Sequence, residues 1–145
     1  MKVEIERIGK TLLDAPIGHT EQTISDIIKK PVQLKVVEQS LVSDTEYVRK
    51  VVIGHSQFPI LQAIVKFDSK NIPNPVMTDL LQKEEGLGKI LQKNQITAQR
   101  RHASVYLGRD KKTVSREYEI FCNGSLWFQV SEKIRLDLLQ ASKKG

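Results

Sequence analysis

The stretch EYVRKVVIGHSQFPILQAIVKF (residues 46–67) decides the fold class, because it contains two alternating runs joined by a short polar link. In residues 46–54, and again in 58–67, apolar side chains recur at every second position, which is the period of a half-buried strand. The link at 55–57 is too short for a crossover, so the two strands should pair antiparallel as a hairpin. The sequence therefore predicts a sheet built from antiparallel neighbours.

The same alternation recurs on both sides of this hairpin. Further strands are expected at 32–42, 96–107, 113–122 and 125–134, with a short one at 2–8. Asn123-Gly124, between two alternating runs, is a strong signal for a two-residue hairpin turn. The six longer segments predict a six-stranded antiparallel sheet.

Helical patterns interrupt the strands at two places and follow the last one. In residues 20–30 isoleucines recur three and four positions apart, which is the spacing of one helical face. Residues 76–93 predict two short helices hinged at Gly86-Leu87-Gly88, and residues 136–142 a last helical turn. Runs of strands with segregated helices indicate an α+β fold with a single six-stranded antiparallel sheet and a few short helices.

Length and composition restrict the class of protein. The chain has 145 residues, which predicts one domain over 1–145 and no helix-turn-helix before residue 20. No apolar run approaches the roughly 20 residues that span a membrane, and a single cysteine allows no internal disulfide. We therefore expect a cytoplasmic protein that does not act at a membrane.

The formal net charge of +6 admits a nucleic acid, an anionic small molecule or simple solubility as its explanation. The basic residues are scattered among acidic ones, and no alternation of basic and aromatic residues suggests base stacking. We therefore predict a small-molecule ligand and no nucleic-acid partner. The oligomeric state stays open.

Three ionisable residues occupy positions where the sheet pattern expects apolar side chains. Arg49 lies between Tyr47 and Val51 on one strand face, Arg116 precedes Tyr118 on another, and Glu132 continues an apolar face on a third. Ionised side chains are rarely buried unless they are paired. Each could lie near a strand end with its charged group in water. Arg49 is the hardest to explain in that way, because it is in mid-strand.

Other chemistry has little support in the sequence. The three histidines are far apart and lack the spacing of metal ligands. Gly86-Leu87-Gly88 lacks the nearby Gly-Lys-Ser/Thr of a phosphate-binding loop. We expect neither a metal nor an organic cofactor.

The unusual residues fall in an order that resembles the chorismate lyase (chorismate pyruvate-lyase) family, from about residue 12 to residue 134. The motifs that carry the resemblance are Leu12-Leu13-Asp14, Tyr47-Val48-Arg49, Gly86-Leu87-Gly88, Arg116–Ile120 before Asn123-Gly124, and Ser131-Glu132. Each motif is short, but their order covers most of the chain. The resemblance implies a chorismate lyase-like domain.

The resemblance also implies a binding site. Arg49 would pair with the carboxylate of 4-hydroxybenzoate, the backbone of Leu87 would hold the same group, and Glu132 would contact the ring hydroxyl. Thr20 would belong to a flap over the site, and the face argument adds Arg116 as a further binding residue. The implied reaction is elimination of pyruvate from chorismate to give 4-hydroxybenzoate or a related aromatic acid, with Glu132 and Arg49 as the catalytic pair and no cofactor.

The sequence departs from the family pattern at three places. Gly86 stands where the family has proline, and Ile64 stands where some members carry a second arginine. The stretch 124–132 is one residue too long, so the match of Glu132 requires a β-bulge.

Two alternatives to the lyase stay open. One is a non-catalytic domain that binds or senses a small carboxylate, because effector-binding domains of some bacterial transcription regulators resemble this fold. The other is a related enzyme acting on another enolpyruvyl or aromatic acid.

Overall fold

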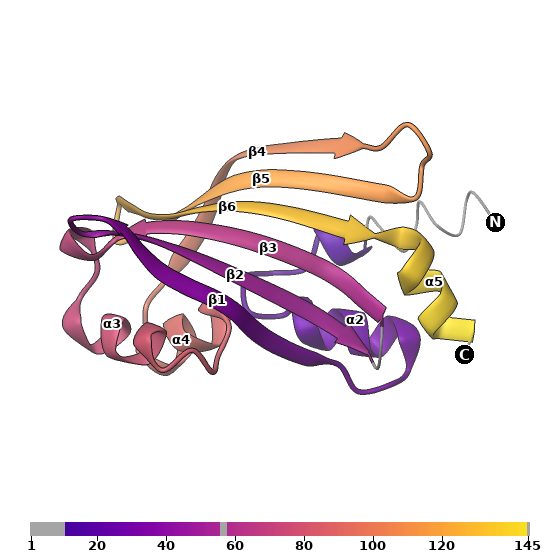
Figure 1. The fold of residues 1–145 in the computed structure, drawn as a ribbon, viewed down its shortest axis with the longest axis horizontal. Coiled ribbons are helices and arrows are strands. Elements are labelled where there is room, and N and C mark those ends of the chain that lie inside the picture. The colour runs from indigo at the N-terminus through magenta and orange to yellow at the C-terminus, as the bar shows by residue number, and fades with distance from the viewer. Residues whose placement is uncertain (1–10, 56–57, 145) are drawn as a thin grey trace.

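A single sheet organises the fold in the computed structural model, which describes residues 11–55 and 58–144 (Figure 1). The strands are β1 Gln33–Ser43, β2 Glu46–His55, β3 Phe58–Asp68, β4 Ala98–Leu107, β5 Thr113–Cys122 and β6 Ser125–Arg135. All neighbours are antiparallel, in the order β1-β2-β3-β6-β5-β4. The predicted α+β fold with a six-stranded antiparallel sheet is confirmed. The strand expected at 2–8 lies outside the described residues.

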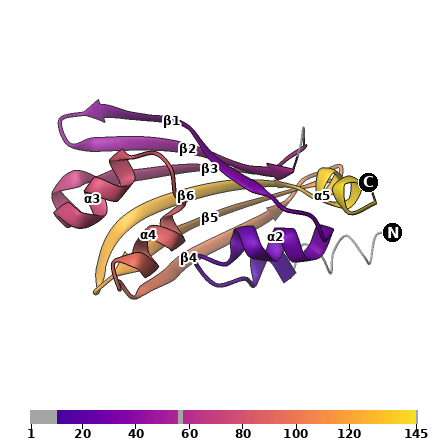
Figure 2. The same cartoon turned by 90° about the horizontal axis from the view of Figure 1, so that it is seen from below.

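The helices α2, α3 and α4 lie on the same face of the sheet, and α5 follows the end of β6 (Figure 2). Their bounds are α2 Thr20–Ile28, α3 Asn74–Leu81, α4 Leu87–Lys93 and α5 Leu136–Lys144, with a 3-10 turn at Ser69–Asn71. The two short helices predicted within 76–93 are therefore present, separated at residues 82–86. No described helix is long and apolar enough to cross a membrane.

The register aligns the inward-facing residues of the sheet into cross-strand rows. One row runs Arg49, Val65, Val130, Tyr118 across β2, β3, β6 and β5; the next runs Val51, Ala63, Glu132, Arg116. Side chains in a row point to the same face, because successive residues of a strand alternate between faces. The three anomalous residues of the sequence thus lie in two adjacent rows beneath the helices.

A β-bulge in β6 makes this alignment possible. Ile120 faces Phe128 while Phe121 faces Leu126, so Trp127 is the extra residue of β6. This is the bulge that the length of the stretch 124–132 predicts. The hairpin at its base turns through Asn123 and Gly124, both at positive φ (54° and 80°), as expected for a tight two-residue turn.

Two hydrophobic clusters lie on either side of the charged residues in these two rows. One joins α3 and α4 to the end of the sheet that carries Phe67 and Phe128. The other joins α2 and α5 to the end that carries Ile60 and Ile134. The buried charged residues therefore lie between two apolar clusters, beneath the gap between α2 and α4.

The first turn of α4 packs backbone to backbone against the loop before α2. A Cβ atom placed on Gly88 would lie 2.0 Å from the Cα atom and 2.3 Å from the N atom of Gly18. No side chain fits at this contact, so glycine is required at position 88 for α4 to approach the loop. The sequence pattern gives no sign of this long-range constraint.

We expect Gly88→Ala to destabilise the protein by about 1–3 kcal/mol, the usual range for overpacking, even though alanine favours a helix. Gly86→Ala is the matched control. Its Cβ would lie 2.8 Å from a terminal methyl of Leu34, and a flexible side chain can move away. Urea denaturation compares the two variants, and an equal loss in both would contradict the proposed close contact.

A candidate ligand-binding site

A cavity of about 290 Å³ lies between the sheet, α2 and α4. Its floor is apolar, formed by Val51, Ile53, Leu61, Ala63, Val65, Ile120 and Val130. Three polar groups of the sheet also line it: Arg100, Tyr118 and Glu132. Its mouth is lined by residues of the loop before α2, of α2 itself and of the first turns of α4, including Thr20 and Leu87. A mainly apolar cavity with a few convergent polar groups is typical of a small-molecule site.

The structure brings three of the five predicted site residues to this one cavity. Thr20, Leu87 and Glu132 line it from α2, α4 and β6. Arg49 and Arg116 do not line it, although their row neighbours Val65 and Glu132 do. The structure therefore brings three of the five to the cavity and leaves the two arginines beside residues that line it.

The side chain of Arg49 is completely buried, at 0% exposure. Its Nη2 donates to the carbonyl of Glu85, its Nη1 lies 3.5 Å from Oε1 of Gln39, and its Nε has no partner among the described residues. No carboxylate of the described chain forms an ion pair with it. Burial lowers the pKa of Arg49 to about 10, so it remains a cation at neutral pH.

Arg49 also has a structural role in holding the turn between α3 and α4. It contacts Glu85, whose neighbour Gly86 lines the cavity. Gln39 donates to the carbonyl of Leu80 at 2.9 Å, and Lys93 pairs with Glu85 at 2.8 Å. These bonds hold the turn, whose residue Gly86 lines the cavity, against the sheet.

Glu132 belongs to a buried polar cluster. Its Oε1 accepts from Nε of Arg116 at 2.7 Å, and its Oε2 accepts from the hydroxyl of Tyr118 at 2.8 Å. Burial, reinforced by the charge of Glu132, raises the pKa of Tyr118 far above its ordinary value, so the hydroxyl stays a donor. A carboxylate has further acceptor positions, so Glu132 can still accept a hydrogen bond from a ligand hydroxyl.

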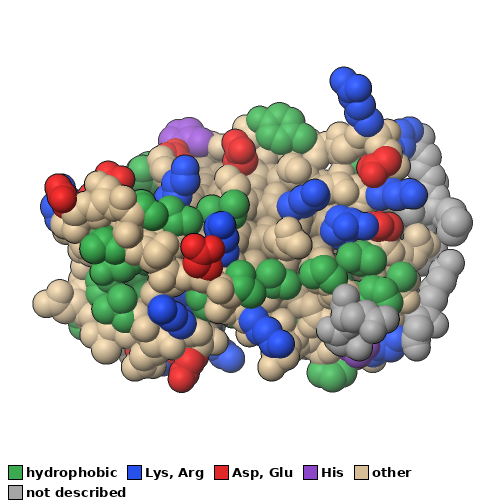
Figure 3. Space-filling model, in the orientation of Figure 1, with side chains coloured by type: hydrophobic (Ala, Val, Ile, Leu, Met, Phe, Trp, Pro, Cys, Tyr) green, Lys and Arg blue, Asp and Glu red, His purple; other side chains and the backbone are tan. Residues whose placement is uncertain are grey.

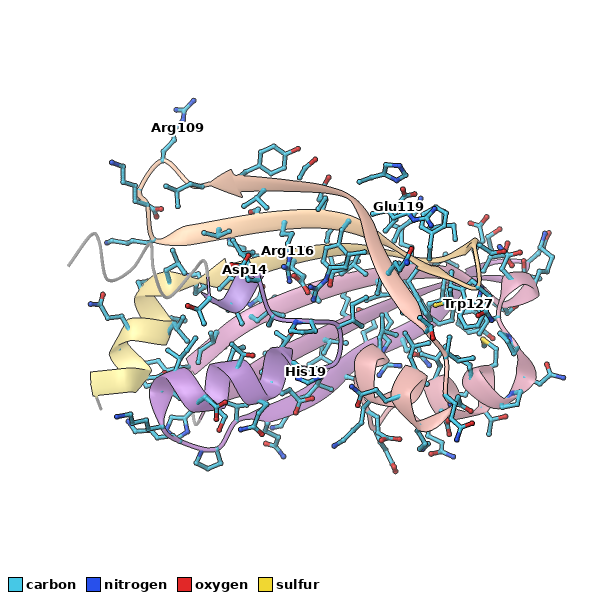
Figure 4. The ribbon with its side chains drawn as sticks, turned by 180° about the vertical axis from the view of Figure 1, so that it is seen from behind. Asp14, His19, Arg109, Arg116, Glu119 and Trp127 are labelled. Carbon is cyan, nitrogen blue, oxygen red and sulfur yellow. The ribbon has the colours of Figure 1, made fainter. Side chains whose placement is uncertain are left out.

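Arg116 acts as the partner of Glu132 and as a tether for the N-terminal segment. Its Nη1 donates to the carbonyl of Leu13 at 2.8 Å. Figure 4 shows Arg116 beneath the sheet beside the segment that carries Asp14. Its guanidinium therefore already has two fixed acceptors.

Arg100 is a site residue that the sequence argument missed. It lines the cavity from β4, its Nη1 donates to the carbonyl of Ala15 at 2.5 Å, and its guanidinium lies 5.1 Å from the centre of the Tyr118 ring. The signal was present, because alternation in β4 places Arg100 on the same face as half-buried Ala98. The described residues contain no cluster of three or more metal-ligating side chains.

Charge on the visible surface is mixed rather than concentrated. In the orientation of Figure 1, basic and acidic side chains are interspersed (Figure 3). The concave apolar cavity is therefore a better defined candidate site than any charged patch on this face.

Comparison with known proteins identifies the fold. No protein-family model and no curated protein matches the sequence. The effector domain of PhnF from Mycobacterium smegmatis superposes with a TM-score of 0.60 at 10% identity, over 85% of this chain and 91% of that domain. The whole PhnF chain gives 0.61 at 10% identity, over 84% of this chain and 65% of its own length.

A GntR-family transcriptional regulator from Bacillus cereus matches with a TM-score of 0.50 at 14% identity, over 72% of this chain and 91% of that chain. At such identities the likeness concerns the fold. The chain has the chorismate lyase-like fold, which it shares with the effector domain of PhnF.

Proposed function

We propose that this domain binds a small aromatic carboxylate in the cavity and acts as a non-catalytic sensor domain. The observation that carries the proposal is Arg49, a fully buried cation with no carboxylate partner among the described residues, whose cross-strand neighbour Val65 lines the apolar cavity. A buried charge is costly unless it is paired, and proteins keep such groups where they serve a function. An anionic ligand supplies the missing partner.

The geometry of Arg49 suits a carboxylate. Nε has no partner and Nη2 is held by the carbonyl of Glu85. These two nitrogens form one edge of the guanidinium, which matches a carboxylate in bidentate fashion. The ligand would displace the Glu85 carbonyl as acceptor and shift the turn that carries Gly86 and Leu87.

The rest of the cavity suits an aromatic ring with a hydroxyl group. The volume of about 290 Å³ is at the small end of ligand pockets, and the floor is aliphatic. Glu132 lies at the β6 side and has acceptor capacity for a hydroxyl. A ligand such as 4-hydroxybenzoate therefore has a partner for each end and an apolar surface for its ring.

Structural neighbours favour sensing over catalysis. One of the similar structures is the effector domain of PhnF, and the Bacillus cereus protein is a transcriptional regulator. An effector domain needs a selective cavity and a mobile element beside it, but no catalytic group. The cavity is the first feature, and the turn held by Arg49 would be the second once a ligand displaces the Glu85 carbonyl from the guanidinium.

Replacing Arg49 with Met should weaken binding of 4-hydroxybenzoate by about 10- to 100-fold, the value of a lost charged hydrogen bond. The unliganded variant should be as stable as the parent or more stable, because an unpaired buried charge is removed. Titration calorimetry measures the affinity, and thermal melts without ligand measure stability.

Lys50→Met is the matched control for this experiment. Lys50 is the next residue of β2, points to the opposite face and makes only an exposed pair with Glu38 at 3.3 Å. It should change neither affinity nor stability appreciably. Undiminished affinity in Arg49→Met would refute the assignment of the carboxylate to Arg49.

The second candidate function is the lyase. It is favoured by one observation: Thr20, Leu87 and Glu132, which the family resemblance selects from distant parts of the chain, line one cavity. In this reaction the ether C–O bond of chorismate breaks, the ring loses a proton and becomes aromatic, and pyruvate leaves. Orientation of the substrate and exclusion of water would be the main contributions of the protein.

An assay of purified protein with chorismate separates the two functions. The sensor predicts that 4-hydroxybenzoate raises the melting temperature while pyruvate forms no faster than it does spontaneously. The lyase predicts pyruvate and 4-hydroxybenzoate in equal amounts, with a loss of about 100-fold or more in Glu132→Gln. Glu117→Gln, on the exposed face of β5, is the control and should leave any turnover unchanged.

A further inference from the structure

We propose that Arg100 binds a second anionic group, so that the cavity is built for a dianionic ligand such as an aromatic dicarboxylate. This inference rests on the proposed function, because it adds a second charge to the same ligand. It concerns a residue that neither the family motifs nor the fold comparison singles out. Three features of Arg100 support it.

The first feature is position. Arg100 lies on β4 and Arg49 on β2, and the strands β3, β6 and β5 lie between them. With neighbouring strands about 4.8 Å apart, the two backbones are separated by roughly 19 Å across the sheet. The two arginines thus flank the apolar floor of the cavity from opposite sides, and Arg100 is part of the lining itself.

The second feature is unused hydrogen-bonding capacity. Only Nη1 of Arg100 has an acceptor, the carbonyl of Ala15, whereas Nε is buried and has no partner among the described residues. No described carboxylate forms an ion pair with Arg100. A buried donor without an acceptor is unfavourable, and an anion in the cavity would satisfy it.

The third feature is that Glu132, the acid of the sheet that lines the cavity, does not neutralise Arg100. Glu132 is occupied by Arg116 and by the hydroxyl of Tyr118. The ring of Tyr118 instead packs against Arg100, with 5.1 Å between its centre and the guanidinium carbon. Stacking on an aromatic face fixes the orientation of the planar group while leaving its edge available for a carboxylate.

Arg101 provides an internal comparison. It is the next residue of β4, is exposed, and stacks over Phe121 at 4.6 Å on the other face of the sheet. It does not line the cavity. Substituting either arginine removes the same charge from adjacent positions, so a difference between the two variants reports on the cavity alone.

Titration calorimetry with three probes tests the proposal: 4-hydroxybenzoate, terephthalate and 4-(carboxymethyl)benzoate. The two dicarboxylates differ in spacing and carry a second charge in place of the hydroxyl. We expect at least one of them to bind the parent protein about 10- to 100-fold more tightly than 4-hydroxybenzoate. Arg100→Gln should abolish this preference, so that the dicarboxylate binds no more tightly than 4-hydroxybenzoate.

Two further variants keep the test decisive. Arg101→Gln should retain the preference for the dicarboxylate. Arg100→Lys, which keeps the positive charge but loses the planar guanidinium, should retain part of it. Thermal melts identify a variant that fails to fold, in which case Arg100→Lys supplies the comparison.

The outcomes separate the two proposals. Tight binding of 4-hydroxybenzoate without any preference for a dicarboxylate overturns the role of Arg100 and leaves the proposed function intact. An unchanged preference in Arg100→Gln also overturns it. Binding of none of the probes contradicts the proposed function itself, and the role of Arg100 with it.

Discussion

The structure depends on one constraint: charged side chains are buried between the sheet and the helices that cover one of its faces. The helices bring two apolar clusters together over the strands, and the charged residues of the middle rows are enclosed between them. Arg116 and Glu132 meet the constraint by pairing with each other. Removal of one member of such a pair typically costs about 3–5 kcal/mol, because the other is left buried and uncompensated. Arg49 is buried just as deeply, yet it has only neutral oxygens as partners.

This contrast distinguishes a paired buried charge from an unpaired one within the same sheet. The Arg116–Glu132 pair joins two strands and holds the carbonyl of Leu13, so it contributes to the architecture as well as to the cavity wall. Both oxygens of Glu132 already accept hydrogen bonds, an arrangement that suits positioning and accepting more than delivery of a proton. Arg49 and Arg100 have no carboxylate partner in the described chain, and the proposed ligand would bring the negative charge that they lack.

The sequence predicted the local and periodic features of this protein well. Alternation located the six described strands and placed Arg49 on an inward face, while the family match of Glu132 required the bulge that the structure shows at Trp127. The features it could not predict depend on contacts between distant segments. The close approach of Gly88 to Gly18 and the pairing of Arg116 with Glu132 exist only once the strand order and the path of the N-terminal loop are known. Arg100 was visible by the same alternation, but a doublet of arginines in a strand exposed for most of its length resembles ordinary surface charge.

Two arginines of the sheet hold residues 13–15 by hydrogen bonds, and these bonds link that segment to the cavity thermodynamically. Arg116 holds the carbonyl of Leu13 and Arg100 holds that of Ala15. Arg100 lines the cavity, and Arg116 is bonded to Glu132, which also lines it. The segment continues directly into Ile17 and Gly18, which form part of the mouth. A ligand that forms hydrogen bonds with either guanidinium would change how strongly the arginine binds this segment. By thermodynamic reciprocity, displacing the segment would change the affinity for the ligand. The cavity and the start of the described chain therefore form one coupled unit.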